Sequence, residues 1–200
     1  MIKNVIFDIG NVLTEFCWRE FFESFGYSED IIEKLADATT RNDSWNELDR
    51  GAMEVEDVID LFVRNDPSIE KEIRQVTQNI SGIIKKCDYA IPWITHLKEE
   101  GYHVYYLSNF FKKAEVECAH ALDFLPYMDG GILSYKENLI KPDAAVYKLL
   151  MSRYELDPEE CVFIDDRLDN CEAARALNIT AIQFKSYEQV LDALREIGVN

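Results

Sequence analysis

The stretch Val5-Ile6-Phe7-Asp8-Ile9-Gly10-Asn11, near the start of the chain, decides the fold. Its β-branched and aromatic residues favour a buried strand, and the Gly-Asn pair predicts the turn that ends this strand. Similar runs recur at 103–107 and 161–164, and each of them also ends in polar residues. Weaker patterns predict two more strands, at 131–133 and 179–184.

Helical patterns precede or follow most of these strands, at 91–100, 144–154, 169–177 and 187–197. Strands that alternate with helices in this way are typical of parallel βαβ units. The sequence therefore predicts an α/β fold, with an open, mainly parallel, Rossmann-like sheet and helices on both of its faces.

The segment between the first two strong strands has a different pattern. It contains no convincing strand and shows five helical patterns, at 18–25, 29–38, 45–50, 55–63 and 69–86. About seventy helical residues are too many for one crossover and enough for a small lobe. We therefore predict a helical cap at 16–89, inserted after the first strand into a core formed by 1–15 and 90–200.

Length and charge limit the partners of this chain. Its 200 residues suit one core with a modest inserted lobe, and 48% hydrophobic with 30% charged residues is typical of a globular protein. The formal charge is −17, which repels nucleic acid and anionic membranes and suits a monomer. The sequence has no apolar run long enough to span a membrane. A small anionic substrate would need a local positive site.

The cysteines and the N-terminal residues indicate a cellular compartment. The chain has five cysteines and no Cys-x-x-Cys pair, and its first residues, 1–8, lack the pattern of a signal peptide. We expect free thiols in a reducing environment, and hence a cytoplasmic protein.

Polar side chains follow the three strongest strands at the point where each strand ends. The first ends at Asp8, the second at Ser108-Asn109 and the third at Asp165-Asp166, and Lys141 lies between the last two. In an open parallel sheet, ligands bind outside the carboxyl ends of the strands. We therefore expect carboxylates, a hydroxyl and an ammonium group to converge on one edge of the sheet.

This set of groups is suited to phosphoryl transfer. The carboxylates could hold Mg²⁺, Lys141 and Ser108 could bind phosphoryl oxygens, and Asp8 could attack phosphorus. Taken alone, each residue has an ordinary explanation as a turn, a helix cap or a surface charge. The order and the strand-end placement of the whole set favour the chemical interpretation.

The sequence also resembles a known family, the haloacid dehalogenase superfamily of hydrolases, most of which are Mg²⁺-dependent phosphatases. The resemblance covers the whole chain, and the helical insertion matches the cap of this family. The matching stretches are Phe7-Asp8-Ile9-Gly10-Asn11-Val12-Leu13, Tyr106-Leu107-Ser108-Asn109, Lys141-Pro142-Asp143, and Phe163-Ile164-Asp165-Asp166 with Asn170 four residues on. The Gly-Asn-Val variant of the first motif and the turn at 49–53 look most like the bacterial α-glucose-1-phosphate phosphatase branch.

The resemblance implies a metal site. Asp8 would be both the nucleophile and a ligand of Mg²⁺, and Gly10 would offer its backbone carbonyl. Asp166 would be the second carboxylate ligand. Asp165 would bind the metal or hold a metal-bound water, and Asn170 would support this group.

The resemblance also implies a phosphate site. Ser108 would bind a phosphoryl oxygen, with Asn109 beside it, and Lys141 would bridge the phosphate and the nucleophile. Asn11, close to the nucleophile, is a further candidate for substrate binding.

One position departs from the family pattern. Most phosphatases of this family carry a second Asp, a general acid and base, where this chain has Gly10. General acid catalysis contributes about 10²–10⁴-fold. Three explanations compete: a substrate with a good leaving group, which we favour; a substitute acid, for which Glu15 is the candidate; or a slow or inactive protein.

Substrate selection is expected to come from the cap. Trp18 and Trp45 are candidates to face the substrate, because aromatic rings often stack on sugars. The alternative is that both side chains pack the interior of the helical lobe.

These observations lead to one favoured function and two alternatives. The favoured function is a Mg²⁺-dependent phosphatase that acts on a small phosphorylated metabolite, above all a sugar phosphate such as glucose 1-phosphate, through an aspartyl-phosphate on Asp8. The first alternative is a catalytically weak or inactive metal-binding interaction protein of the same fold. The second is a 2-haloacid dehalogenase, a metal-free chemistry in which the Asp165-Asp166 pair would be unhelpful.

Overall fold

The computed structural model describes residues 1–200, and its centre is a five-stranded parallel sheet with the order β5-β4-β1-β6-β7. The strands are β1 (Asn4–Phe7), β4 (His103–Ser108), β5 (Gly130–Leu133), β6 (Cys161–Asp165) and β7 (Thr180–Gln183). β1 is buried along its whole length and pairs with β4 on one side and β6 on the other. All five predicted strands are confirmed, and so is their parallel arrangement.

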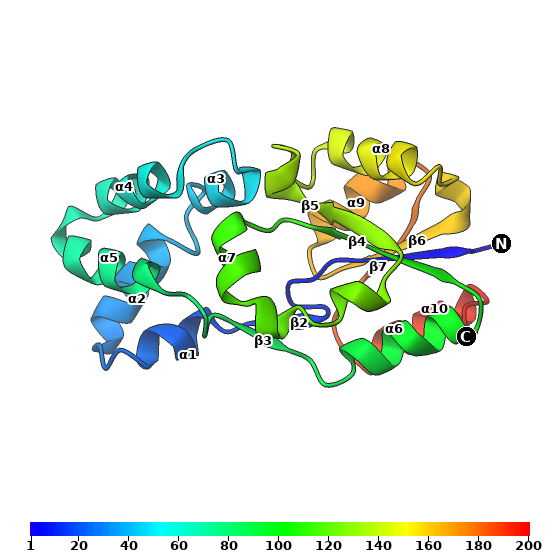
Figure 1. Cartoon of the computed structure of the whole chain (residues 1–200), viewed down its shortest axis with the longest axis horizontal. Coiled ribbons are helices and arrows are strands. Elements are labelled where there is room, and N and C mark those ends of the chain that lie inside the picture. The colour runs from blue at the N-terminus through cyan, green and yellow to red at the C-terminus, as the bar shows by residue number, and fades with distance from the viewer.

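Helices cover both faces of this sheet (Figure 1). One face carries α6 (Ala90–Glu99) and α10 (Tyr187–Glu196), and the other carries α8 (Ala144–Arg153) and α9 (Leu168–Arg175). Alternation along β1 explains the two layers, because successive side chains of a strand point to opposite faces. Val5 and Phe7 join the apolar cluster that contains Trp93 of α6, whereas Ile6 joins the cluster that contains Tyr147 of α8.

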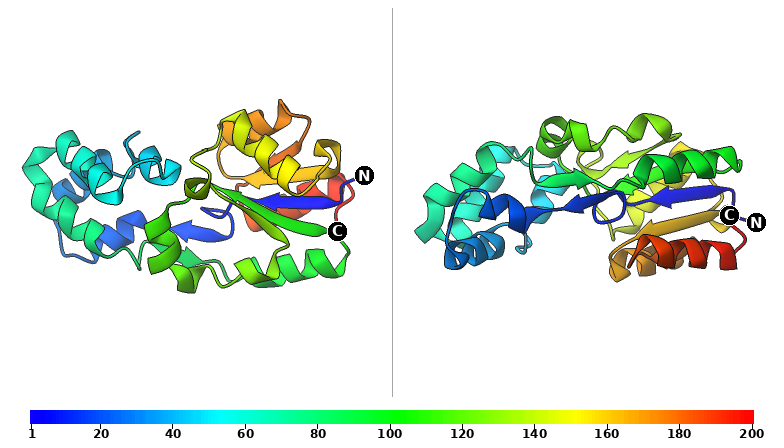
Figure 2. Two further views of the ribbon diagram at one scale, coloured as in Figure 1. Left: turned by 45° about the horizontal axis from the view of Figure 1, so that its top comes forward. Right: turned by 90° about the horizontal axis from the view of Figure 1, so that it is seen from below.

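Five helices between β1 and β4 form a lobe at the end of the molecule opposite the two termini (Figures 1 and 2). They are α1 (Trp18–Glu23), α2 (Glu29–Ala38), α3 (Trp45–Arg50), α4 (Val55–Asn65) and α5 (Glu70–Gln78). Leu35 of α2 and Phe62 of α4 are fully buried and belong to the same apolar cluster as Val5 and Phe7. The lobe and the sheet therefore share one continuous core.

A two-stranded antiparallel sheet joins the chain that enters the lobe to the chain that leaves it. Thr14–Phe16 (β2) pairs with Ile84–Lys86 (β3), so that Phe16 lies opposite Ile84. Neither strand was predicted from the sequence, where the segment 16–89 was expected to be helical. The prediction of a single helix over 69–86 was wrong, because α5 ends at Gln78 and the turn-forming residues 79–82 separate it from β3.

The remaining elements are short. They are α7 (Lys112–Glu117) and the 3₁₀ helices η1 (Pro67–Ile69), η2 (Ala119–Ala121), η3 (Leu125–Tyr127), η4 (Ser134–Lys136) and η5 (Pro158–Glu160). No helix of the structure combines the length and the apolar character needed to cross a bilayer.

Candidate active site

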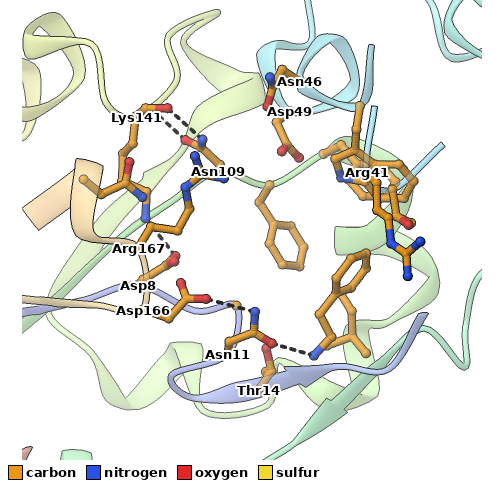
Figure 3. Close-up of a pocket in the computed structure, with 18 of the residues that line it drawn as sticks. Asp8, Asn11, Thr14, Arg41, Asn46, Asp49, Asn109, Lys141, Asp166 and Arg167 are labelled. Atoms are coloured by element: carbon orange, nitrogen blue, oxygen red, sulfur yellow. Dashed lines mark hydrogen bonds and ion pairs between the residues drawn. The ribbon is translucent and has the colours of Figure 1, made fainter. Parts of the chain in front are cut away.

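A cavity of about 380 Å³ lies where the carboxyl ends of the strands face the helical lobe (Figure 3). The sheet side contributes predicted site residues, namely Asp8, Gly10, Asn11, Asn109, Lys141, Asp166 and Asn170. The lobe side contributes Trp45 and several polar residues of the segment 40–49. The pocket thus brings together most of the predicted residues, and it adds a group of cap residues that were not predicted.

Asp8 is placed at the pocket by the central strand. Its backbone N–H donates to the carbonyl of Ile164 at 2.8 Å, which extends the pairing of β1 with β6 by one residue. One carboxylate oxygen of Asp8 accepts the N–H of Ile9 at 2.7 Å and lies 2.9 Å from Nζ of Lys141. The nucleophile candidate is therefore held by contacts on its own loop and by an ion pair.

Lys141 is a buried cation between two carboxylates. Its Nζ lies 2.9 Å from Asp8 and 2.6 Å from Asp165, and only 3% of the residue is exposed. Burial lowers the pKa of Lys141, but the charges of Asp165 and Asp8 outweigh burial and raise it above its usual value. A buried ammonium is tolerated when it is paired in this way, so Lys141 carries a permanent charge at the pocket.

Asn109 fixes the backbone of Lys141. Its amide nitrogen donates to the Lys141 carbonyl at 3.0 Å, and its amide oxygen accepts the Lys141 N–H at 2.8 Å. Asn109 also lines the pocket, as expected for a neighbour of the phosphate site. Asn109 therefore also positions the backbone of Lys141, a role that was not predicted from the sequence.

Asp165 points into the protein and does not line the pocket. Its two carboxylate oxygens accept from Lys141 at 2.6 Å, from the amide of Asn170 at 3.0 and 3.1 Å, and from the N–H of Arg167 at 2.8 Å. The residue is fully buried. Of the two alternatives for Asp165, this geometry favours a group that positions Lys141 and Asn170 over a direct metal ligand.

Asp166 points into the pocket beside Asn11. The amide nitrogen of Asn11 donates to Asp166 at 3.1 Å, and the amide oxygen of Asn11 accepts the N–H of Phe16 at 3.2 Å. Burial raises the pKa of Asp166, the hydrogen bond from Asn11 lowers it, and the charge of Asp165 raises it again. Asn11 therefore connects the strand-end carboxylate to β2, where the chain enters the lobe.

The carboxylates form a site that fits a hard dication. Oxygens of Asp8, Asp165 and Asp166 lie within 4.8 Å of one another. Burial raises the pKa of Asp8 to about 7, against the opposing charge of Lys141, so the site needs more positive charge to hold Asp8 ionised. The buried Oδ1 of Asn170 also lacks any donor. With Asp165 held by its own hydrogen bonds and adding negative charge behind them, the oxygens of Asp8 and Asp166 and the carbonyl of Gly10 are an all-oxygen donor set that suits Mg²⁺.

Ser108 is the last residue of β4 and is almost completely buried. A hydrogen bond from its hydroxyl lowers the pKa of Asp8, although burial dominates that pKa overall. Ser108 does not line the pocket, and its hydroxyl lies 3.5 Å from the carbonyl of Asn109, to which it can donate.

Besides Asp165 and Ser108, two more of the predicted residues lie outside the pocket lining. Glu15 occupies the exposed position of β2, between the pocket-lining Thr14 and Phe16, because alternate side chains of a strand point to opposite faces. It cannot serve as the substitute acid from there. Trp18 lies outside the pocket as well, under the guanidinium groups of Arg19 and Arg41 at 5.2 and 4.9 Å from its ring.

Trp45 does line the pocket, at the start of α3. Its ring stacks on Phe62 and meets Phe111 edge-on, with centroids 5.9 and 5.5 Å apart. One part of the Trp45 side chain thus packs the lobe and another borders the cavity, so its contact with a substrate stays a prediction.

Asp49 is the one buried residue among the pocket-lining cap residues of the segment 40–49 that were not predicted as site residues. It is 8% exposed, and its carboxylate accepts no hydrogen bond and forms no ion pair with any group of the protein. Burial, followed by the charge of Asp8, raises its pKa to about 7, and Lys141 opposes this change. One signal was available: Asp49 follows Trp45 by four residues, so the two share a face of the helix.

The fold and the site define a class of protein: an α/β chain in which strand-end carboxylates and a buried lysine face a pocket covered by inserted helices. The particular family follows from comparison with known proteins. The chain belongs to the haloacid dehalogenase-like hydrolases, whose family pattern it matches over residues 2–178.

Two relatives and one solved structure are distant in sequence but match this chain over almost their full length. The sesquiterpene phosphatase astK of Aspergillus oryzae is 23% identical, covering 98% of this chain and 96% of its own. The D-ribitol-5-phosphate phosphatase of Bacteroides thetaiotaomicron is 26% identical, covering 92% of each chain. A haloacid dehalogenase family enzyme of the same bacterium, solved with magnesium and inorganic phosphate, superimposes with a TM-score of 0.71 at 24% identity, covering 95% and 99% of the two chains.

Proposed function

We propose that this protein is a Mg²⁺-dependent phosphatase that hydrolyses small phosphorylated metabolites, with Asp8 as the nucleophile. One observation carries the proposal: Asp8 and Asp166 face a common pocket, and Lys141 forms an ion pair with Asp8 at 2.9 Å. The family membership and two relatives named as phosphatases support the same reaction class.

Each residue has a defined task in this proposal. Asp8 attacks phosphorus and becomes an aspartyl-phosphate, which water then hydrolyses. Lys141 neutralises charge on the transferred group and keeps Asp8 in place. Asp166, Asp8 and the carbonyl of Gly10 would hold Mg²⁺, which when bound draws charge from the phosphoryl oxygens. Asp165 and Asn109 keep Lys141 in position through the contacts described above.

The pocket favours a sugar-like substrate over an apolar one. Of its 20 lining residues only five are hydrophobic, which suits hydroxyl groups better than an isoprenoid chain. Trp45 offers an aromatic edge against which a sugar ring can pack. The named substrate of one relative, D-ribitol 5-phosphate, is of the same polar class. Within this class, glucose 1-phosphate is our first candidate, because its anomeric oxygen is a good leaving group.

The helical lobe would act as the cap that selects this substrate. We place its boundaries at the β2–β3 pair, close to the expected limits of 16 and 89, since this pair is where the chain crosses between sheet and lobe.

Phosphate release from p-nitrophenyl phosphate and from a panel of sugar phosphates tests the proposal. Wild-type protein is compared with and without Mg²⁺, and with Asp8→Asn, which keeps the shape of the side chain. We expect turnover that requires both Mg²⁺ and Asp8. Folded, Mg²⁺-loaded protein that releases no more phosphate than Asp8→Asn would contradict a catalytic function.

A further inference from the structure

Asp49 lies across the pocket from Asp8, on the side formed by the lobe (Figure 3). In phosphoryl transfer the attacking and leaving oxygens are roughly in line with phosphorus. If Asp8 attacks from the sheet side, the leaving oxygen therefore points toward the lobe. Figure 3 shows the carboxyl of Asp49 directed into the cavity from that side.

The backbone around Asp49 is fixed to the sheet domain. The hydroxyl of Ser134 donates to the carbonyl of Asp49 at 2.6 Å, and the amide of Asn138 donates to the carbonyl of Arg50 at 3.1 Å. Gly51 ends the helix with φ of 66° and packs so closely that a Cβ there would lie 2.7 Å from Tyr135. These contacts hold the Asp49 side chain over the site.

Ser134 also connects Asp49 to the phosphate-binding loop. Its hydroxyl oxygen accepts the N–H of Phe110 at 2.8 Å, directly after Ser108-Asn109. The position of Asp49 is therefore linked to the strand-end groups by a single buried side chain. A group that must meet a reacting atom needs this kind of preorganisation.

There is free space at Gly10, where most phosphatases of this family carry the acid. A Cβ built on Gly10 would meet no heavy atom within 4 Å, and the φ of Gly10 is not in the left-handed region. Glu15, the acid candidate from the sequence, lies at the exposed position of β2 and does not line the pocket. Asp49 is the buried, unpartnered carboxyl that faces the same cavity.

We propose that Asp49 is the general acid and base of this enzyme and replaces, from the cap, the carboxylate that Gly10 cannot supply. The inference rests on the proposed phosphatase function and extends it to esters with poor leaving groups. It also explains the missing carboxylate at Gly10 in a different way from a substrate whose leaving group needs no acid.

The proposed cycle balances in protons and charge. In the first step the Asp8 carboxylate bonds to phosphorus, the ester P–O bond breaks, and the proton of Asp49 passes to the leaving oxygen, which departs as an alcohol. In the second step the Asp49 carboxylate takes a proton from water, whose oxygen bonds to phosphorus while the bond to Asp8 breaks. Inorganic phosphate leaves, and both residues return to their starting states.

The environment of Asp49 is compatible with this task. Burial raises its pKa to about 7, so both protonation states are accessible near neutral pH. A general acid and base works best when its pKa is close to the working pH.

The test compares two leaving groups in Asp49→Asn. The nitrophenolate of p-nitrophenyl phosphate leaves without a proton, whereas the alkoxide of D-ribitol 5-phosphate or glycerol phosphate does not. We expect kcat/KM for the alkyl esters to fall about 10²–10⁴-fold and that for the aryl ester to change by less than about 3-fold. The matched control is Glu47→Gln, on the same helix but outside the pocket, which should alter neither.

A rescue variant separates catalysis from folding. Because the space at Gly10 is open, Gly10→Asp combined with Asp49→Asn should restore alkyl phosphate hydrolysis by about 10-fold or more. An equal loss on both ester types without rescue would overturn the inference and indicate a structural role for Asp49. The inference would also be overturned if Asp49→Asn hydrolysed alkyl phosphates as fast as the wild type, or if the wild type hydrolysed only the aryl ester. A wild type that hydrolyses neither ester would refute the phosphatase function itself.

Discussion

The two sides of the pocket differ in how their charged groups are paired. We call the sheet side the paired wall and the lobe side the unpaired wall. On the sheet side, Lys141, Asp8 and Asp165 are buried and joined to one another at 2.6–2.9 Å. On the lobe side, Asp49 is buried to a similar degree and has no partner. Unpaired buried carboxyls are costly, and proteins retain them chiefly at functional sites. The difference indicates that the protein pairs most charges of the sheet side itself and leaves the rest to a cation, whereas Asp49 on the lobe side is left for the substrate.

The largest effect is expected when the paired wall is broken. Lys141→Ala leaves two buried carboxylates without their cation, and removal of one partner from a buried ion pair costs about 3–5 kcal/mol. Urea denaturation in Mg²⁺-free buffer should therefore give a much lower free energy of unfolding. Lys136→Ala, which removes a largely exposed cation, is the control and should change stability by less than about 1 kcal/mol. Similar values for the two variants would contradict the paired wall.

Removal of the charge from the unpaired wall should have the opposite effect and raise the free energy of unfolding. The folded-state pKa of Asp49, about 7, lies above its ordinary value of 3.8, so the folded protein binds more protons there than the unfolded chain. The stability that this group provides is present below the ordinary pKa and is lost as pH rises through about 7. Asp49→Asn should thus stabilise the protein by about 2–4 kcal/mol at about pH 8 and by little at about pH 4.

Chemical denaturation of both proteins across this pH range measures the effect. A destabilised Asp49→Asn at about pH 8 would mean that the carboxylate has a structural partner after all, and the contrast between the two walls would then disappear.

These two walls also differ in how far the sequence predicts them. Asp8, Ser108 and Asp166 directly follow apolar strands, and parallel strands end at one edge, so local patterns predict that they meet. Asp49 reaches the pocket because Ser134, 85 residues away in the sequence, holds its carbonyl. No local pattern encodes a contact of that kind.

The errors of prediction have similar physical causes. β2 and β3 are three residues long and only partly buried, which is too short for a periodic signal. Trp18 and Trp45 are alike as residue types, and only the docking of the helices decides that Trp45 alone borders the cavity. The parallel sheet and its covering helices, by contrast, show as strand patterns that alternate with helical patterns along the chain, and they were predicted correctly.

A smaller effect should follow when the anchor between the two walls is disturbed. In Gly51→Ala the new Cβ would lie 2.7 Å from Tyr135, at a backbone φ that disfavours a side chain. We expect a loss of about 1–3 kcal/mol in stability and a fall in kcat on alkyl phosphates as Asp49 moves. Gly26→Ala has a similar φ but open space around it, so thermal unfolding of the two variants isolates the steric part. Equal losses would argue against the anchor.

The smallest effect should distinguish the two tryptophans. Trp45→Phe keeps an aromatic ring against Phe62 but shortens the edge that borders the cavity. KM for sugar phosphates should rise about 2- to 10-fold, the range of one aromatic contact, and kcat should change less. Trp18→Phe, outside the pocket, should leave KM unchanged. A larger effect at Trp18 would place the substrate elsewhere on the lobe.

The most direct test of the whole account is to identify the phosphorylated intermediate. Wild-type protein with Mg²⁺ and p-nitrophenyl phosphate is quenched in acid during turnover, and its peptides are weighed by mass spectrometry. The account predicts one added phosphoryl group on the peptide that contains Asp8, absent from Asp8→Asn. Phosphate release by the wild type with that peptide unmodified, or unchanged turnover in Asp8→Asn, would contradict it.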